Sequence, residues 1–337
     1  MDLRPDALQA QLARGVAATL AKGGDAWTRS AELGVPALGL PAAAGGLDLG
    51  LSAEIVAAGE MGRALAPLAG HRETMLAAGV LVEVAAGSPF LSRIAAGEVR
   101  LAAAGLGGEP APALDGAGRL RGRSAPLPAV AWDGALVRAR GEGRDALLLV
   151  ELPAAGCRSE AVETVAGPEA RLVFDGAAGL TLLEDGAGRA LERPVAAARV
   201  RQAALLLGVA RAAGRAARDR AAARRQFGRR LIEFQSVGHR LAALAGELEG
   251  VTLLVHEAAW RWDGCLPPEP SAAQALAAAA ELALGATRLA VQVHGAAGML
   301  TGSIPERAYR LAGVEATRLG TPGALWWEAG SRRLAMI

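Results

Sequence analysis

Hydrophobic residues recur every three or four positions near both ends of the chain, and this spacing predicts helices. After Ser52, a residue type that caps helices, the spacing is followed by Ile55, Val56, Met61 and Leu65. A longer stripe beyond residue 193 is formed by Leu241, Leu244, Leu248, Val251 and Val255. Such a stripe is typical of a helix in a bundle. We therefore expect helical domains at residues 1–98 and 193–337.

Between residues 99 and 192 the pattern changes to short alternating or β-branched runs. Segments such as GALVRAR (134–140) and ALLLVE (146–151) are separated by glycine, proline and Asp-Gly pairs, which favour turns between strands. The Asp-Gly pair at the start of Asp185–Leu191 predicts a hairpin turn. The glycines of this segment also resemble the start of a dinucleotide fingerprint, but no βαβ unit surrounds them. The middle of the chain is therefore predicted to be a β domain at residues 99–192.

Composition narrows the classes of partner. The net charge of +2 over 337 residues predicts neither a nucleic-acid surface nor an anionic-membrane surface. We find no signal-peptide core and no apolar run of about 20 residues, and the histidines show no ligand spacing, so neither a membrane span nor a metal is expected. Cys157 and Cys265 lack a disulfide framework, which predicts a reducing, cytoplasmic location.

Two segments carry candidate chemistry. Arg224–Gly228, followed by Gln235, interrupts two helical patterns and gathers an arginine, an amide and an aromatic ring. Arginine pairs with phosphate and the ring offers a stacking surface, so these residues suit a dinucleotide; a helix corner with a solvated basic rim is equally compatible. In Gln292–Arg310, small residues from Gly295 to Gly298 permit close approach of a ligand, although the segment alone favours a simple helix end at His294.

Taken in their order along the chain, the helical and β regions and the two candidate segments resemble the acyl-CoA dehydrogenase family of flavoproteins over most of the chain. The resemblance implies a mainly α fold with a central β domain: an amino-terminal helical domain, a β-barrel-like middle domain and a carboxy-terminal four-helix bundle. RRQFGRRLIEFQ is similar to the family's R-x-Q-F-G…Q signature, and QVHGAAG to its Q-x-x-G-G-x-G loop. These matches imply FAD contacts, partly across a subunit boundary, for Arg224, Gln226, Phe227, Gln235, Gln292, Gly295, Gly298 and Thr321. On the substrate side, the matching positions are Arg199 and Arg310.

The family's catalytic glutamate has no counterpart at its expected positions. That glutamate removes the α-proton of an acyl-CoA thioester while the flavin N5 accepts the β-hydride. Its usual position falls on Leu319, and the position used by some members falls on Ala198; neither side chain can take a proton. Glu315 is the nearest substitute, with a solvent-facing helix residue as the alternative. The family's middle-domain loop and Trp-Ile-Thr strand, which grip the isoalloxazine, are not recognisable.

The resemblance therefore implies an FAD-containing oxidoreductase subunit acting on the CH–CH group of an acyl-CoA, in fatty acid or sterol degradation. Some bacterial members pair a glutamate-bearing subunit with a shorter one that lacks it, and this chain resembles the short one. We expect a homo- or hetero-oligomer, a dimer or tetramer, with a paralogous subunit. Two alternatives stay open: a self-sufficient flavoenzyme with a substitute base, and a non-catalytic scaffold of the same fold.

Overall fold

The computed structural model describes residues 6–66, 70–141, 143–165, 167–267 and 270–335. The chain divides into two compact units. The helical unit comprises residues 1–21, 55–66 and 199–337, and the mixed unit comprises residues 22–54 and 67–198. Every candidate site residue except Ala198 belongs to the helical unit.

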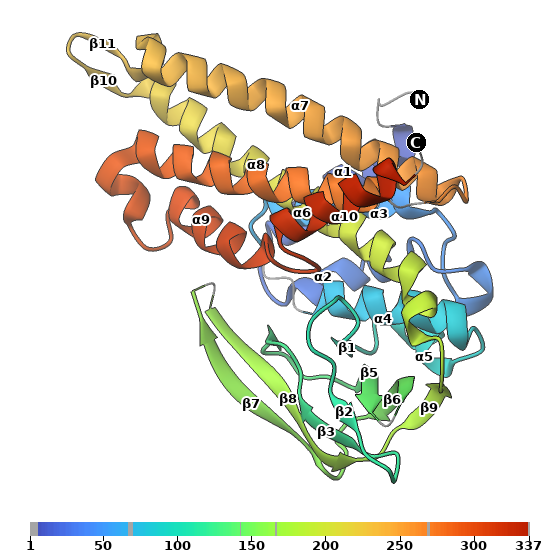
Figure 1. Cartoon of the computed structure of the whole chain (residues 1–337). Coiled ribbons are helices and arrows are strands. Elements are labelled where there is room, and N and C mark those ends of the chain that lie inside the picture. Colours follow the sequence, from blue (N-terminus) through green and yellow to red (C-terminus); the bar gives the residue numbers. More distant parts are fainter. Residues whose placement is uncertain (1–5, 67–69, 142, 166, 268–269, 336–337) are drawn as a thin grey trace. The chain divides into compact units, whose positions relative to one another are not determined.

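Long helices build the helical unit (Figure 1). They are α1 (Ala7–Leu20), α7 (Gln235–Asp263), α8 (Ser271–His294), α9 (Ile304–Glu315), α10 (Pro322–Leu334) and the later parts of α3 (Leu51–Arg63) and α6 (Ala187–Ala223). In α7, Leu244, Val251 and Val255 of the predicted stripe are buried. A side chain at Gly62 or Gly208 would collide with the backbone of the facing helix, so glycine permits the close packing of α3 on α6.

The α8 segment is the most apolar of these helices. Residues Ser271–Met299 are long and apolar enough to cross a membrane by length and composition, but 56% of an apolar 18-residue stretch within this segment is buried inside the protein. Ala275, Leu276, Ala279 and Ala283 are among its buried side chains. This burial is what a core helix of a bundle shows.

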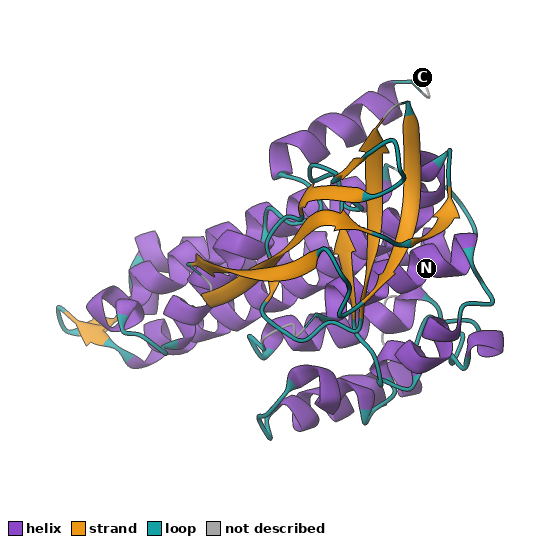
Figure 2. Cartoon of the chain, turned by 90° about the horizontal axis from the view of Figure 1, so that it is seen from below, coloured by secondary structure: helices purple, strands orange, loops and turns teal. Residues whose placement is uncertain are grey.

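The mixed unit joins short helices to one sheet (Figure 2). Its helical segments are α2 (Ala26–Ala31), η1 (Val35–Ala37), η2 (Ala42–Ala44), α4 (His71–Val84) and α5 (Pro89–Ala95). The strands are β1 (Leu101–Ala104), β2 (Ala113–Leu114), β3 (Leu120–Arg123), β4 (Leu127–Pro128), β5 (Gly134–Gly141), β6 (Arg144–Glu151), β7 (Cys157–Thr164), β8 (Gly167–Ala177) and β9 (Leu180–Leu183). The α–β–α order along the chain agrees with the predicted fold class.

Among the described residues the sheet has nine strands, in the order β4-β8-β3-β2-β5-β6-β9, with β1 on β5 and β7 on β8. The pairs β1–β5 and β2–β5 are parallel, whereas the other ladders are antiparallel. Val137, Leu148, Leu172 and Phe174 contribute to the sheet core. The sheet is therefore mixed rather than a simple run of hairpins.

The hairpin turn predicted at Asp185–Leu191 is wrong. Residues from Ala187 onward form the start of α6, and the amides of Arg189 and Ala190 donate to the carbonyl of Gly186. Pro194 lies inside this helix. The Asp-Gly signal was local, and the alanine-rich sequence after it favours helix.

We expect Asp145→Asn to weaken the sheet in a pH-dependent way. Arg138 holds Asp145 through two hydrogen bonds of 2.7 and 2.6 Å and lowers the pKa of that carboxyl to about 2. Because this folded-state pKa lies below the unfolded one, the pair stabilises the fold at neutral pH and loses its effect as pH falls towards about 2. Chemical denaturation at several pH values should show a loss of about 1 kcal/mol at neutral pH, small because the carboxyl is partly exposed.

The matched control is Asp175→Asn on the same sheet. Asp175 pairs with Arg121 at 2.9 Å, but its side chain is 84% exposed. Its replacement should leave the denaturation midpoint almost unchanged. Equal effects of the two variants would contradict the assignment of stability to the Arg138–Asp145 pair.

Candidate functional site

Three of the predicted cofactor-binding residues lie on a short hairpin between α6 and α7. After α6 ends at Ala223, β10 (Arg225–Gln226) pairs antiparallel with β11 (Arg229–Arg230). The two turn residues, Phe227 and Gly228, have φ values of 49° and 80°. A two-residue turn with positive φ at both positions fits the twist of a hairpin, and glycine adopts that conformation without strain. The local sequence therefore projects Phe227 at the tip.

The tip of this hairpin is almost fully exposed. Phe227 has 92% of its surface exposed, and its ring meets Phe234 edge-on with a centroid distance of 6.4 Å. The guanidinium of Arg229 stacks on the ring of Phe234, 4.0 Å from the ring centroid. Within the described part of the chain, Arg224 and Gln226 have no side-chain hydrogen bond or ion pair. An exposed ring beside an unpaired guanidinium suits a ligand or another chain.

A second predicted segment follows α8. Gly295 starts the turn η4 (Gly295–Met299) with φ 61° and ψ −140°, a conformation that only glycine adopts readily. Gly298 is buried, and a Cβ there would lie 2.8 Å from the His294 Cβ, so its role in the fold is close packing. Gln292 is exposed on the last turn of α8. Gly298 therefore shapes the loop, while Gln292 and Gly295 are accessible.

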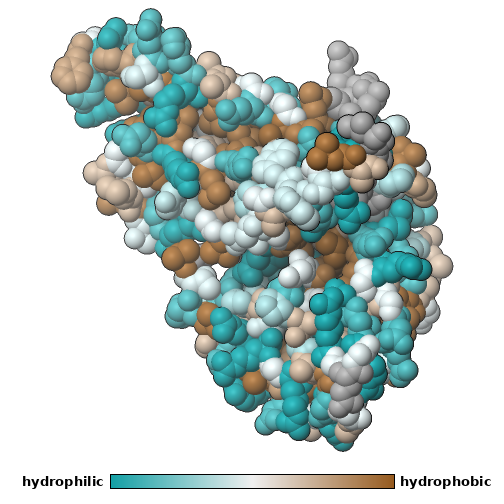
Figure 3. Space-filling model, viewed as in Figure 1, coloured by the Kyte–Doolittle hydropathy of each residue, from teal (hydrophilic) through white to brown (hydrophobic). Residues whose placement is uncertain are grey.

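The hairpin and the end of α8 lie at the same end of the bundle (Figure 1). Gln235 is the first residue of α7 and is exposed. Apolar side chains are also exposed here: Figure 3 shows hydrophobic residues on this surface, and Met299, Leu300 and Ile304 are each more than half exposed. We call Arg224–Gly228, Gln235 and Gln292–Leu300 the bundle tip. The bundle tip thus contains the residues that the resemblance assigns to FAD except Thr321, which caps α10.

The turn between α9 and α10 contains the position expected for the catalytic base. Leu319 adopts φ 62°, and its carbonyl accepts a hydrogen bond of 3.2 Å from Arg199 Nε on α6. The same guanidinium forms an ion pair of 2.9 Å with Glu328 on α10. Ala198 is buried in α6 beside Arg199. The arginine predicted for the substrate side and the leucine at the base position are therefore adjacent.

Glu315, the substitute base considered from the sequence, is buried rather than solvent-facing. Only 5% of its surface is exposed. Gln202, which is also buried, donates through Nε2 to the Glu315 carboxylate at 2.8 Å and to its backbone carbonyl at 2.9 Å. The alternative of a solvent-facing residue is wrong, because α9 turns this side chain towards α6. Whether Glu315 takes a proton stays a prediction.

The remaining predicted residues make local contacts. Arg310 forms an ion pair with Glu306 on its own helix at 2.9 Å. Thr321 caps α10, its hydroxyl accepting from the amide of Ala324 at 3.4 Å. The carboxylate of Glu306 also accepts from the amide of Gly302, and this bond together with Arg310 lowers its pKa. These contacts explain local order, and the predicted ligand roles of Arg310 and Thr321 stay predictions.

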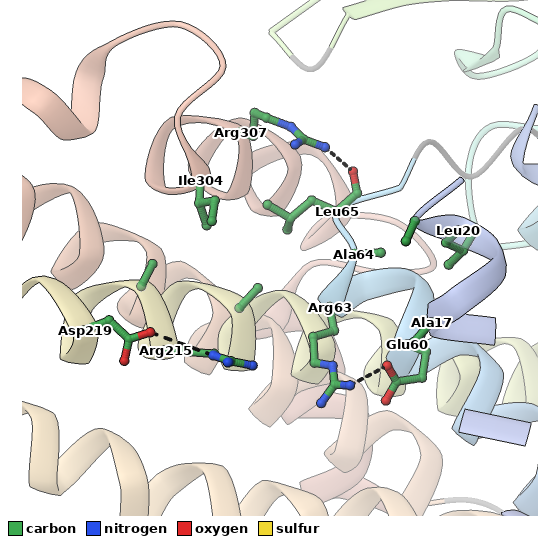
Figure 4. A pocket seen from close by; sticks show the side chains of 13 residues that line it. Ala17, Leu20, Glu60, Arg63, Ala64, Leu65, Arg215, Asp219, Ile304 and Arg307 are labelled. Atoms are coloured by element: carbon green, nitrogen blue, oxygen red, sulfur yellow. Dashed lines mark hydrogen bonds and ion pairs between the residues drawn. The ribbon is translucent and has the colours of Figure 1, made fainter. Parts of the chain in front are cut away.

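A cleft of about 520 Å³ lies between α1, α3, α6 and α9 in the helical unit (Figure 4). Its wall is mainly apolar, with Ala17, Leu20 and Leu65 among the lining residues. Its arginines are engaged within the chain: Arg63 with Glu60, Arg215 with Asp219, and Arg307 with the carbonyl of Leu65. None of the site residues predicted from the sequence lines this cleft, and we assign no ligand to it.

The bundle tip fits one side of a dinucleotide cofactor. A guanidinium without a side-chain partner suits a diphosphate, and the exposed Phe227 ring suits a flat heterocycle. Glu109 belongs to the mixed unit and not to the bundle tip. Its carboxylate accepts hydrogen bonds from the amides of Leu106 and Gly107 in its own loop, at 3.2 and 2.9 Å. The roles of the bundle-tip residues in holding FAD stay predictions.

Sequence reasoning missed Gln202 and Glu328. Gln202 carried a weak signal in the sequence. It is a polar residue one helical turn after Arg199 and directly before the apolar run AALLLG. Glu328 carried no such signal, because its partner Arg199 is 129 positions away. Both residues were found only through the tertiary structure.

Comparisons with known proteins agree with this architecture. Residues 184–325 match the family described as "Acyl-CoA dehydrogenase, C-terminal domain". Benzylmalonyl-CoA dehydrogenase of Aromatoleum aromaticum is 44% identical over 101 residues, which are 30% of this chain and 26% of that protein. A probable acyl-CoA dehydrogenase of Bacillus subtilis is 37% identical over 33% of this chain and 30% of that protein. The chain thus matches less than a third of the length of these two relatives.

Solved structures match over the whole chain. The ChsE4-ChsE5 complex from Mycobacterium tuberculosis includes a chain with a TM-score of 0.87 and 25% identity, with 100% of both chains covered. Butyryl-CoA dehydrogenase from Megasphaera elsdenii has a TM-score of 0.86 at 21% identity, covering 99% of this chain and 100% of that one. Acyl-CoA dehydrogenases are FAD-dependent flavoproteins. Residues 184–325 therefore belong to the acyl-CoA dehydrogenase C-terminal domain family, and the chain as a whole has the acyl-CoA dehydrogenase fold.

Proposed function

We propose that this chain is a subunit of a heteromeric acyl-CoA dehydrogenase that completes an FAD site without supplying the catalytic base. The observation that carries the proposal is the combination of Leu319 at the base position with an exposed bundle tip. A leucine cannot abstract a proton. The unpaired Arg224 and exposed Phe227 remain available to a cofactor held between two chains.

In this proposal the residues of the bundle tip hold the cofactor and the partner chain supplies the base. When bound, FAD accepts the hydride from the β-carbon of the acyl-CoA. Arg224 would bind the diphosphate, Phe227 would cover an aromatic face, and Gln226, Gln235 and Gln292 would orient the cofactor through their amides. A paralogous partner would supply the carboxylate that takes the α-proton. The bundle tip thus acts by binding and orientation.

One structural relative, the ChsE4-ChsE5 complex, supports the heteromeric form. Another, described as a Tcur3481-Tcur3483 steroid ACAD variant, has 27% identity and a TM-score of 0.83 over 97% of this chain, and it supports a steroid-derived acyl-CoA substrate. We propose the same class of assembly and of substrate here, with fatty acyl-CoA as the broader class. The predicted cytoplasmic location belongs to this proposal.

Reconstitution tests the proposal. We expect the purified chain to show no acyl-CoA dehydrogenation alone, and to gain activity with bound FAD when combined with a co-encoded glutamate-bearing paralogue. Flavin absorbance and dye reduction measure the two properties. The matched control is the paralogue alone, which should lack full flavin occupancy. Activity of this chain without the paralogue would contradict the proposal.

The buried Glu315 gives the self-sufficient alternative its one structural argument. A buried carboxyl can act as a base if burial raises its pKa and the substrate reaches it. In this chain, however, its carboxylate is buried and already accepts a hydrogen bond from the amide of Gln202, so a substrate would have to displace that contact. We therefore favour the heteromeric function.

A further inference from the structure

The contacts of Arg199 tie three elements of the helical unit together. From α6, its Nε donates to the carbonyl of Leu319 in the α9–α10 turn, and its NH1 pairs with Glu328 on α10. The arginine side chain is 13% exposed and that of Glu328 is 28% exposed. An arginine with so little exposure needs a compensating charge, because an uncompensated buried ion is costly. Glu328 supplies that charge from within the chain.

The turn that Arg199 holds is conformationally constrained. Leu319 has φ 62° and Gly320 has φ 129°, and a Cβ at Gly320 would lie 2.9 Å from the Leu325 side chain. A left-handed conformation is unfavourable for leucine and persists only when surrounding contacts hold it. The hydrogen bond from Arg199 to the Leu319 carbonyl is one such contact. One helical turn further along α6, Gln202 anchors the end of α9 through Glu315.

We propose that Glu328 and Arg199 form a structural clamp that positions the α9–α10 turn. In this role Glu328 is a counter-ion of Arg199. Arg199 then stabilises the α9–α10 turn of its own chain and does not bind the substrate. This inference goes beyond the proposed function, and its first tests need neither FAD nor a partner.

A double-mutant cycle on the full-length chain tests the clamp. Arg199→Met and Glu328→Gln should each lower the melting temperature by about 5 °C, because each removes the 2.9 Å ion pair of a little-exposed arginine, whereas the contact that Glu328 keeps with Arg332 is longer, at 3.7 Å. The double variant should lose no more than the more damaged single variant. Amide hydrogen exchange of residues 316–321 should accelerate in Arg199→Met, since the turn loses its anchor.

The matched control is the pair Arg215 and Asp219, also on α6. Their side chains are 72% and 56% exposed and 3.8 Å apart, so Arg215→Met, Asp219→Asn and the double variant should show no coupling. Strictly additive losses for Arg199 and Glu328 would overturn the clamp. If Arg199→Met does not fold, Glu328→Gln and its hydrogen exchange still decide the question.

Ligand binding separates a clamp from a substrate-binding arginine. In the reconstituted assembly, Arg199→Met and Glu328→Gln should change the acyl-CoA affinity by the same small factor, because both substitutions act through the α9–α10 turn. A tenfold or greater loss of affinity in Arg199→Met alone would show that Arg199 contacts the substrate and would overturn the proposal. Failure of the assembly to form would instead contradict the proposed function and leave the stability cycle valid.

Discussion

Replacing Arg224 by alanine is expected to release FAD from the assembled enzyme. Arg224 lies at the exposed end of α6, and no side chain within the described ranges occupies its guanidinium. A charge-assisted bond to phosphate is worth about 1.5–3 kcal/mol, which corresponds to a loss of about 10- to 100-fold in affinity. Equilibrium dialysis of FAD against the assembly, followed by flavin fluorescence, measures this change.

Arg225→Ala is the matched control, since Arg225 is the next residue, is equally exposed and pairs across the hairpin with Arg230. Its replacement removes the same charge without removing the group that we assign to the diphosphate. We expect at most a small loss of affinity, and unchanged thermal stability for both variants. Unchanged flavin content in Arg224→Ala, or equal losses in both, would refute the specific role of Arg224.

The second large effect concerns the origin of the base. Replacing the catalytic glutamate of the proposed partner by glutamine should reduce turnover by about 10²- to 10⁴-fold, the usual contribution of general base catalysis. By contrast, Glu315→Gln in this chain should leave turnover nearly unchanged, because glutamine retains an acceptor for Gln202. Single-turnover reduction of the flavin by acyl-CoA separates this step from product release.

Leu319→Ala provides the control for the base position, since neither side chain takes a proton. Its turnover should match that of the unmodified assembly, with only a stability effect from the altered turn. If Glu315→Gln abolished turnover while the partner's substitution did not, the chain would be a self-sufficient flavoenzyme with Glu315 as its base. The two substitutions therefore distinguish the alternatives directly.

The parts of the fold that depend on local signals were predictable. Hydrophobic spacing identified the helix that carries Leu244, Val251 and Val255, and turn chemistry identified a central β region. The parallel pairing of β1 and β2 with β5 depends on tertiary packing, and no local pattern specifies it. At Asp185–Leu191 the local turn signal gave the wrong prediction, because the helical preference of the following residues prevailed.

The candidate site shows the same division. The residues of the bundle tip could be proposed from the sequence because they lie close together along the chain, between Arg224 and Gln235 and between Gln292 and Gly298, and their role stays a prediction. The clamp was not, because Arg199 meets Leu319 and Glu328 from 120 and 129 positions away. The burial of Glu315 likewise depends on how α9 packs on α6.

Anaerobic titration with acyl-CoA tests the central claim most directly. The visible absorbance of the flavin is followed in this chain alone, in the glutamate-bearing paralogue alone and in their mixture. We expect this chain alone to show no substrate-dependent bleaching, and the mixture to bleach in proportion to the assembly formed. A yellow homo-oligomer of this chain that bleaches on its own would contradict the claim that it completes a flavin site without supplying the base.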